Sequence, residues 1–82
     1  MIYKYEVTGR PVFLPSDSRV LTAAYQGDTL YVWVELGSGK RKLNFIFDYV
    51  GTGWYEDTSN KVFVGTVFKD EHVWHIFYEA VE

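Results

Sequence analysis

The residues best suited to binding chemistry stand together in the segment Gly51-Thr52-Gly53-Trp54-Tyr55. Glycines in a turn can aim consecutive backbone N–H groups at a phosphate. The Trp54 and Tyr55 rings offer flat surfaces on which a base can stack, worth about 1–3 kcal/mol per base without net positive charge. The segment therefore predicts a site for a small nucleotide, with Thr52 donating its hydroxyl. The alternative is a bulge or tight turn in which glycine only supplies a positive φ.

A basic cluster, Lys40-Arg41-Lys42, is the second candidate for phosphate contact. Arg41 or Lys42 from a neighbouring subunit can add a charge-assisted hydrogen bond to a bound phosphate. The alternative is a solvated turn whose charges keep a sheet edge from pairing with another chain. We assign Arg41 and Lys42 to the ligand site as residues contributed between subunits.

Catalytic and metal-binding groups are not evident in the sequence. His72 and His75 lie three apart, and in a strand such residues point to opposite faces, so they would not share a metal ion. Glu56 and Asp57, with Asp48, could be imagined as an acid–base pair, but no cleft with convergent groups is evident. The sequence thus predicts no catalytic residues, no metal and no cofactor.

The composition narrows the class of protein. With 82 residues, 48% apolar and 20% aromatic, the chain is expected to form one domain over 1–82 and not to be disordered. Eight basic and eleven acidic residues give a net charge of −3, which argues against binding to duplex nucleic acid. Cysteine is absent, and no apolar run approaches the ~20 residues of a membrane helix. We therefore expect a soluble, cytoplasmic protein without disulfides or a membrane partner.

Alternation of apolar and polar residues predicts β-strands along most of the chain, and no window supports a long amphipathic helix. Gly27-Asp28 predicts a two-residue hairpin turn, and Gly37-Ser38-Gly39-Lys40 predicts a flexible hairpin loop. Pro11 and Pro15 suit a sheet edge or a connection. The expected strands are 2–7, 11–15, 19–26, 29–36, 41–50, 61–68 and 73–79, the last two joined as a hairpin. Six to seven such strands predict an all-β fold, a small antiparallel β-sandwich or barrel.

Some of these strands are apolar on both faces. When the aliphatic residues of strand 29–36 face the core, Tyr31 and Trp33 face outward. In the last strand, Val73, His75 and Phe77 face outward by the same rule. Large exposed apolar patches are rare on monomers, so these five residues predict an interface, and a homo-oligomer is the expected assembly. The alternative is a closed barrel or a covering loop that buries both faces.

Several short segments, in this order and spacing, resemble a family of short tailed-phage proteins known only as a domain of unknown function. The shared segments are Ile2-Tyr3-Lys4-Tyr5-Glu6, Leu14-Pro15, Val20-Leu21, Val32-Trp33-Val34, Gly51-Thr52-Gly53, Gly65-Thr66-Val67 and Val73-Trp74-His75-Ile76-Phe77. The chain departs from the family in carrying Trp54 where relatives often have His or Asn. The resemblance implies an accessory phage protein in the cytoplasm of an infected bacterium, and it supplies no mechanism.

Small phage proteins of this size often counter bacterial defence, which by analogy suggests two functions. The first is a non-enzymatic sponge that sequesters a small nucleotide immune signal, of the cyclic oligonucleotide or cyclic ADP-ribose type. The aromatic content and the lack of evident catalytic groups agree with this function. The second is an inhibitor that binds a host defence protein, since outward Tyr and Trp side chains also make interaction hot spots.

Overall fold

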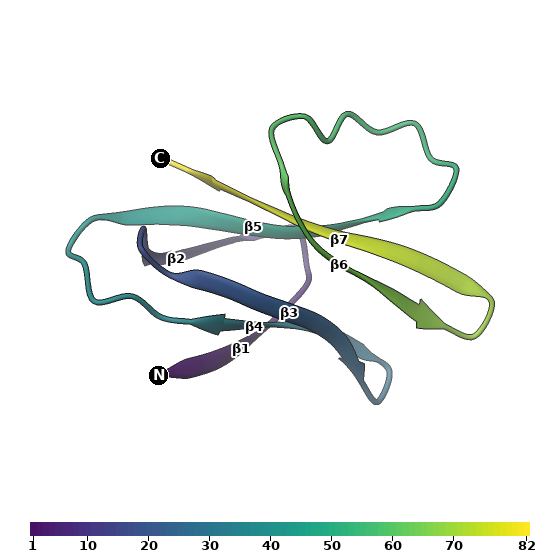
Figure 1. The fold of residues 1–82 in the computed structure, drawn as a ribbon, viewed down its shortest axis with the longest axis horizontal. Coiled ribbons are helices and arrows are strands. Elements are labelled where there is room, and N and C mark those ends of the chain that lie inside the picture. The colour runs from purple at the N-terminus through teal and green to yellow at the C-terminus, as the bar shows by residue number, and fades with distance from the viewer.

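A computed structural model describes all residues 1–82 as seven antiparallel strands without a helix (Figure 1). The strands are β1 (Ile2–Glu6), β2 (Pro11–Pro15), β3 (Arg19–Gln26), β4 (Thr29–Glu35), β5 (Lys42–Gly51), β6 (Val62–Lys69) and β7 (His72–Val81). The strand bounds agree with the expected ones to within a few residues. The chain contains no helix of the length and apolarity that crossing a bilayer requires.

The strands form two sheets, a three-stranded sheet of order β1-β4-β3 and a four-stranded sheet of order β2-β5-β7-β6. The predicted all-β fold is therefore confirmed, with the sandwich-like arrangement of two sheets. Strand β2, which contains Pro11 and Pro15, is an edge strand, as expected for residues that donate no backbone hydrogen bond. Strands β3 and β6, each at the edge of its sheet, lie against one another.

Two tight hairpin turns lie at the same end of the molecule as the last residue of β5 (Figure 1). The predicted Gly27-Asp28 turn joins β3 to β4, and Gly27 has the positive φ of 64° that such a turn requires. The turn between β6 and β7 is also two residues long, Asp70-Glu71, and Asp70 has a φ of 54°. Both turns therefore border the end of the sandwich where the Gly51 segment begins.

The segment Gly37-Ser38-Gly39-Lys40 is not a hairpin loop, and that prediction was wrong. It carries the chain from β4 in one sheet to β5 in the other. The Asp17 carboxylate accepts hydrogen bonds from the N–H groups of Ser38, at 3.3 Å, and Gly39, at 3.2 Å. Glycine and serine suit a crossover as well as a hairpin, so their composition could not separate the two.

The core lies between the sheets and contains side chains that alternate along the strands. Val32 and Val34 of β4 and Ile76 of β7 are completely buried. Phe45 and Phe47 of β5 pack with them, and the cluster is completed by Val7, Leu14, Leu30 and Val67. Tyr31 and Trp33 therefore point away from the core, as the alternation predicted.

The residues predicted to form an interface lie on two opposite outer faces. Tyr31 and Trp33 are on the outside of the three-stranded sheet, where their rings meet edge to face at 6.1 Å. Val73, His75 and Phe77 alternate with the inward residues of β7 and lie on the outside of the four-stranded sheet. One contact surface cannot include both sets, so an assembly using all five residues needs two separate contacts.

Candidate ligand-binding site

The Gly51 segment forms a tight turn as the chain leaves β5. The N–H of Trp54 donates to the carbonyl of Gly51 at 3.1 Å, and Gly53 has a φ of 88°. The backbone N–H groups of Thr52 and Gly53 donate no hydrogen bond to the protein. The turn therefore presents two consecutive free N–H donors on the surface, beside the Trp54 side chain.

Trp54 folds back over the turn instead of extending into solvent. Its indole lies against Gly51 so closely that a Cβ there would stand 2.6 Å from Trp54 Cε2. The ring centroid lies 5.6 Å from that of Trp74 and 6.1 Å from that of Tyr49. Glycine at position 51 is thus the residue that admits the indole.

Trp74 is the centre of this group of aromatic rings. Gly51 and Trp74 are paired across β5 and β7, which places both beneath Trp54. The ring of Tyr49 meets Trp74 edge to face at 5.0 Å, and the imidazole of His72 is parallel to it at 5.5 Å. We call these four side chains, Tyr49, Trp54, Trp74 and His72, the aromatic cluster.

The two loop aromatics predicted to bind a base differ in their surroundings. Trp54 is 55% exposed, with part of its ring free although it packs on Trp74. Tyr55 is completely exposed, and its ring pairs with no other aromatic side chain. Trp54 therefore offers a fixed ring surface, whereas nothing in the structure orients the Tyr55 ring.

A shallow pocket of about 210 Å³ opens beside the turn. It is lined by Gly51, Thr52, Trp54, Glu71, His72, Val73 and Trp74. This volume is below the ~300 Å³ at which pockets for complete small-molecule ligands begin. The pocket of one chain is therefore too small to enclose a complete small-molecule ligand.

A hydrogen-bonded group behind the turn fixes the Thr52 side chain. Thr52 Oγ1 lies 2.7 Å from Nε2 of His75, and Nδ1 of the same imidazole lies 3.0 Å from Thr66 Oγ1. His75 and Thr66 face each other across β7 and β6. The imidazole thus joins the turn to two strands, and both of its ring nitrogens are satisfied.

Arg41 and Lys42 lie at the opposite end of β5 from the turn. Lys42 and Gly51 are the first and last residues of β5, nine steps apart, which is a distance of ~30 Å at 3.3 Å per residue. The Arg41 guanidinium pairs with Glu82 at 2.6 Å, and the Lys42 ammonium lies 5.9 Å from the centre of the Phe13 ring. Either cation can meet a ligand at the turn only from another subunit.

Three carboxylates near the turn have local structural partners, whereas Glu71, which lines the pocket, forms no ion pair. Asp48 accepts the N–H of the next residue at 2.8 Å, and Glu56 lies 3.6 Å from the ammonium of Lys61. The hydrogen bond from the Ser59 backbone N–H lowers the pKa of Asp57. A lowered pKa keeps Asp57 ionised and without a proton to donate at neutral pH.

The comparison with protein families matches the whole chain. A family model described as a domain of unknown function (DUF7352) covers residues 1–82. The chain belongs to this family. No curated protein and no solved structure matches it. Since the description of DUF7352 names no activity, the function has to be argued from the site itself.

The aromatic cluster and the histidine group contain residues that the sequence did not assign to the site. Trp74 and Tyr49 alternate like ordinary strand residues, so nothing in the sequence alone sets them apart as site residues. Thr66 and His75 belong to the segments Gly65-Thr66-Val67 and Val73-Trp74-His75-Ile76-Phe77. Both segments meet Gly51-Thr52-Gly53 at the His75 imidazole, a contact that depends on strand register and that spacing in the sequence does not reveal.

Proposed function

We propose that this DUF7352 protein is a non-enzymatic binding protein that holds a small nucleotide at the Gly51 turn. The observation that carries the proposal is the pair of free N–H groups of Thr52 and Gly53 beside the exposed Trp54 ring. Consecutive N–H donors suit a phosphate, and a partly exposed indole suits a base. The N–H donors and the stacking ring thus lie within one four-residue turn.

The arrangement around the turn gives this site a fixed geometry. His75 holds Thr52, and the Trp74 ring supports Trp54 from below. A preorganised site binds more tightly because less conformational entropy is lost on binding. The small pocket volume favours a ligand shared between two copies of the chain, with Arg41 or Lys42 of the second copy on the phosphate.

The biological setting we propose is that of a phage accessory protein that counters bacterial defence. It rests on the resemblance to short tailed-phage proteins and on the non-catalytic character proposed for the site. The ligand would be a nucleotide immune signal, of the cyclic oligonucleotide or cyclic ADP-ribose type, held without turnover as by a sponge. Asp48, Glu56 and Asp57 are each held by a local partner, which agrees with storage of the ligand over its hydrolysis.

Calorimetry against cyclic dinucleotides and cyclic ADP-ribose isomers tests the proposal, with Trp54→Ala and Tyr55→Ala as matched variants. Loss of a stacking ring worth about 1–3 kcal/mol predicts a 5- to 150-fold weaker affinity for Trp54→Ala. Tyr55→Ala should bind within about twofold of the unmodified protein, because nothing orients that ring. Absence of binding across the panel, or recovery of a chemically altered ligand after heating, would refute the sponge.

A second candidate is an inhibitor that binds a host protein, and one surface favours it. Phe63 and Phe68 on the outside of β6 are 56% and 73% exposed, and Phe77 meets Phe63 edge to face at 5.5 Å. Aromatic residues of this kind are frequent in interfaces.

Native mass spectrometry of protein from bacteria with an active defence system distinguishes the two candidates. A bound mass of several hundred daltons supports the sponge, and a bound polypeptide supports the inhibitor.

A further inference from the structure

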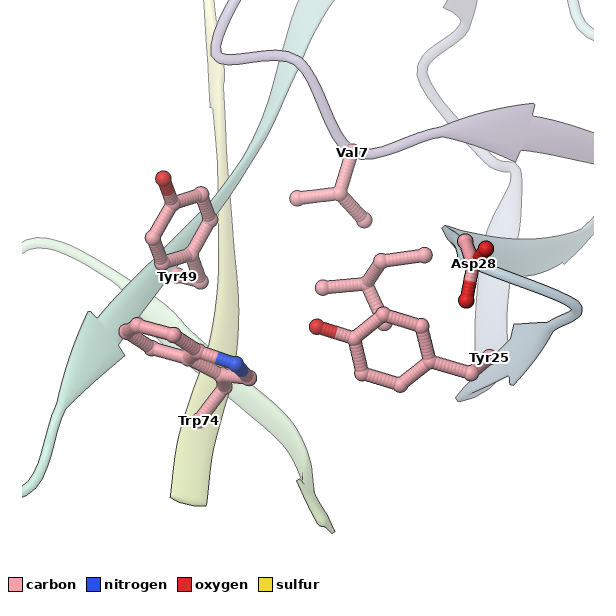
Figure 2. A pocket seen from close by; sticks show the side chains of 6 residues that line it. Val7, Tyr25, Asp28, Tyr49 and Trp74 are labelled. Carbon is pink, nitrogen blue, oxygen red and sulfur yellow. The ribbon is translucent and has the colours of Figure 1, made fainter. Parts of the chain in front are cut away.

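A second hollow, of about 170 Å³, opens between the two sheets at the same end of the molecule. It is lined by Val7, Tyr25, Asp28, Leu30, Tyr49 and Trp74, so Trp74 is the residue that it shares with the pocket beside the Gly51 turn. Figure 2 shows Tyr49 and Trp74 on one side of this hollow and Tyr25 and Asp28 on the other. The β3–β4 hairpin thus faces β5 and β7 across an open space.

The walls of the hollow suit a flat ring. Val7 and Leu30 are buried and give it an apolar floor, while aromatic side chains from both sheets stand at its sides. Its volume is about half the lower bound for a pocket that encloses a complete ligand, which leaves room for one ring system without its sugar. Stacking against such rings is favourable for any base.

Asp28 adds one specific polar group to these walls. Its carboxylate lies 2.9 Å from the Lys69 ammonium, which also donates to the carbonyl of Gly27 at 3.3 Å and stands 5.3 Å from the centre of the Tyr25 ring. The hydrogen bond from Lys69 lowers the pKa of Asp28. An ionised carboxylate is an acceptor with two oxygens, so it selects ligand edges that carry N–H donors.

We infer that this hollow is a base subsite for guanine, with the ring between Tyr25 and Trp74 and its N1–H and 2-amino group donating to Asp28. The inference rests on the proposed function and specifies its ligand as a guanine-containing nucleotide. The Asp28 side chain is almost fully exposed and only its Oδ1 lies against Lys69, so both oxygens keep lone pairs for the two adjacent donors. Adenine presents a bare N1 acceptor at that position, which a carboxylate repels. In a cyclic dinucleotide, this base would lie across Trp74 from the turn that receives the phosphate, and the second base would stack on Trp54.

Nucleosides test the subsite without involving the phosphate site. Tryptophan fluorescence and calorimetry of the full chain with guanosine, inosine and adenosine should show binding of guanosine. Inosine lacks the 2-amino donor, and a hydrogen bond to a charged group is worth about 10- to 150-fold in affinity. Inosine should be weaker by about that factor, and adenosine weaker still. Equal affinities for the three nucleosides, or no binding of any, would overturn the inference.

Two variants separate a ligand role of Asp28 from its ion pair with Lys69. Asp28→Asn removes the carboxylate and should abolish the preference for guanosine over inosine. Lys69→Met removes the same ion pair but leaves the carboxylate, and it should retain the preference. If both variants lose it equally, the ion pair only supports the hairpin and the subsite is wrong. Thermal melts establish that both variants fold, and the nucleoside series on the unmodified protein decides the matter if one does not.

The two proposals can fail separately. The first outcome is a cyclic dinucleotide that binds with the same affinity whatever its bases. If Trp54→Ala abolishes this binding and Asp28→Asn leaves it unchanged, the guanine subsite is overturned and the proposed function is retained. Guanosine binding that requires Asp28, together with no gain in affinity from any phosphate, would retain the subsite and overturn the phosphate site at the turn.

Discussion

Two loops of the molecule share a Gly-x-Gly sequence and use it for different purposes. In Gly37-Ser38-Gly39, the backbone N–H groups of Ser38 and Gly39 are occupied by the Asp17 carboxylate. In Gly51-Thr52-Gly53, the N–H groups of Thr52 and Gly53 have no acceptor in the protein. The first loop binds an anion from its own chain, and the second is open to one from outside.

The glycines themselves are needed for different close approaches. A Cβ at Gly37 would overlap the Asp17 carboxylate, while a Cβ at Gly51 would overlap the Trp54 ring. Asp17 reaches its loop from about twenty residues away in the sequence, whereas Trp54 is three residues beyond Gly51. A Gly-x-Gly pattern thus marks a close approach without identifying the group that approaches.

The largest expected effect is that of Gly37→Ala on folding. The added methyl displaces the Asp17 carboxylate from its two N–H donors, and hydrogen bonds to charged groups are worth about 1.5–3 kcal/mol each. We expect the free energy of unfolding to fall by about 2–3 kcal/mol in urea titrations, with ligand binding unchanged. Ser38→Ala is the control and should change stability by less than about 0.5 kcal/mol, because the structure gives the Ser38 hydroxyl no partner. An unchanged free energy of unfolding in Gly37→Ala would show that the crossover does not depend on Asp17.

Gly51→Ala is expected to act on the site more than on the fold. Its methyl displaces the Trp54 indole from the aromatic cluster, and overpacking of this kind costs about 1–3 kcal/mol. We expect a stability loss near 1–2 kcal/mol, with loss of nucleotide binding in calorimetry. Binding that survives in Gly51→Ala would mean that the position of Trp54 is unimportant, and the contrast between the two loops would then be structural only.

The sequence predicted the local structure better than the long-range contacts. Period-two alternation identified the strands, and the glycine at position 27 identified a two-residue turn, because both depend on neighbouring residues. The contact between the Gly37 crossover and the Asp17 carboxylate depends on which sheet each strand joins. The alternation of apolar and polar residues carries no information about that. The turn at Gly51 was predicted as a ligand site, but its support by Trp74 and His75 follows from the register of β5, β6 and β7.

Thr66→Val probes how strongly the open loop is held. The substitution keeps the shape of the side chain and removes the hydroxyl 3.0 Å from His75 Nδ1. One lost hydrogen bond predicts a decrease of about 0.5–1.5 kcal/mol in the free energy of unfolding. Thr22→Val is the matched control, since Thr22 is an exposed strand residue without a side-chain hydrogen bond. If the two variants change the free energy of unfolding equally, the hydrogen bonds of His75 do not hold the turn in place.

The smallest expected effect concerns a third carboxylate, the exposed Asp28. Its partner is the Lys69 ammonium, whereas the partners of Asp17 are backbone N–H groups. Lys69 lowers the pKa of Asp28 from its usual 3.8, so this stabilisation exists above that pH and is lost as the pH falls through the lowered value. Asp28 raises the pKa of Lys69 from 10.5, so the same contribution is lost as the pH rises through the raised value. We expect Lys69→Met to lower stability slightly between these limits, and the part of this effect due to the ion pair to disappear once Asp28 is protonated at low pH.

The dependence of stability on salt distinguishes the Asp28–Lys69 ion pair from the hydrogen bonds of Asp17. At 1 M salt the screening length falls to about 3 Å, so the difference between Lys69→Met and the unmodified protein should shrink toward what the hydrogen bond to Gly27 contributes. The difference caused by Gly37→Ala should persist, because it also includes a steric overlap and the loss of backbone hydrogen bonds. Urea titrations of both variants at low and high salt measure the two differences directly. If Gly37→Ala were equally sensitive to salt, Asp17 would act as a surface charge, and the two Gly-x-Gly loops would differ less than their geometry indicates.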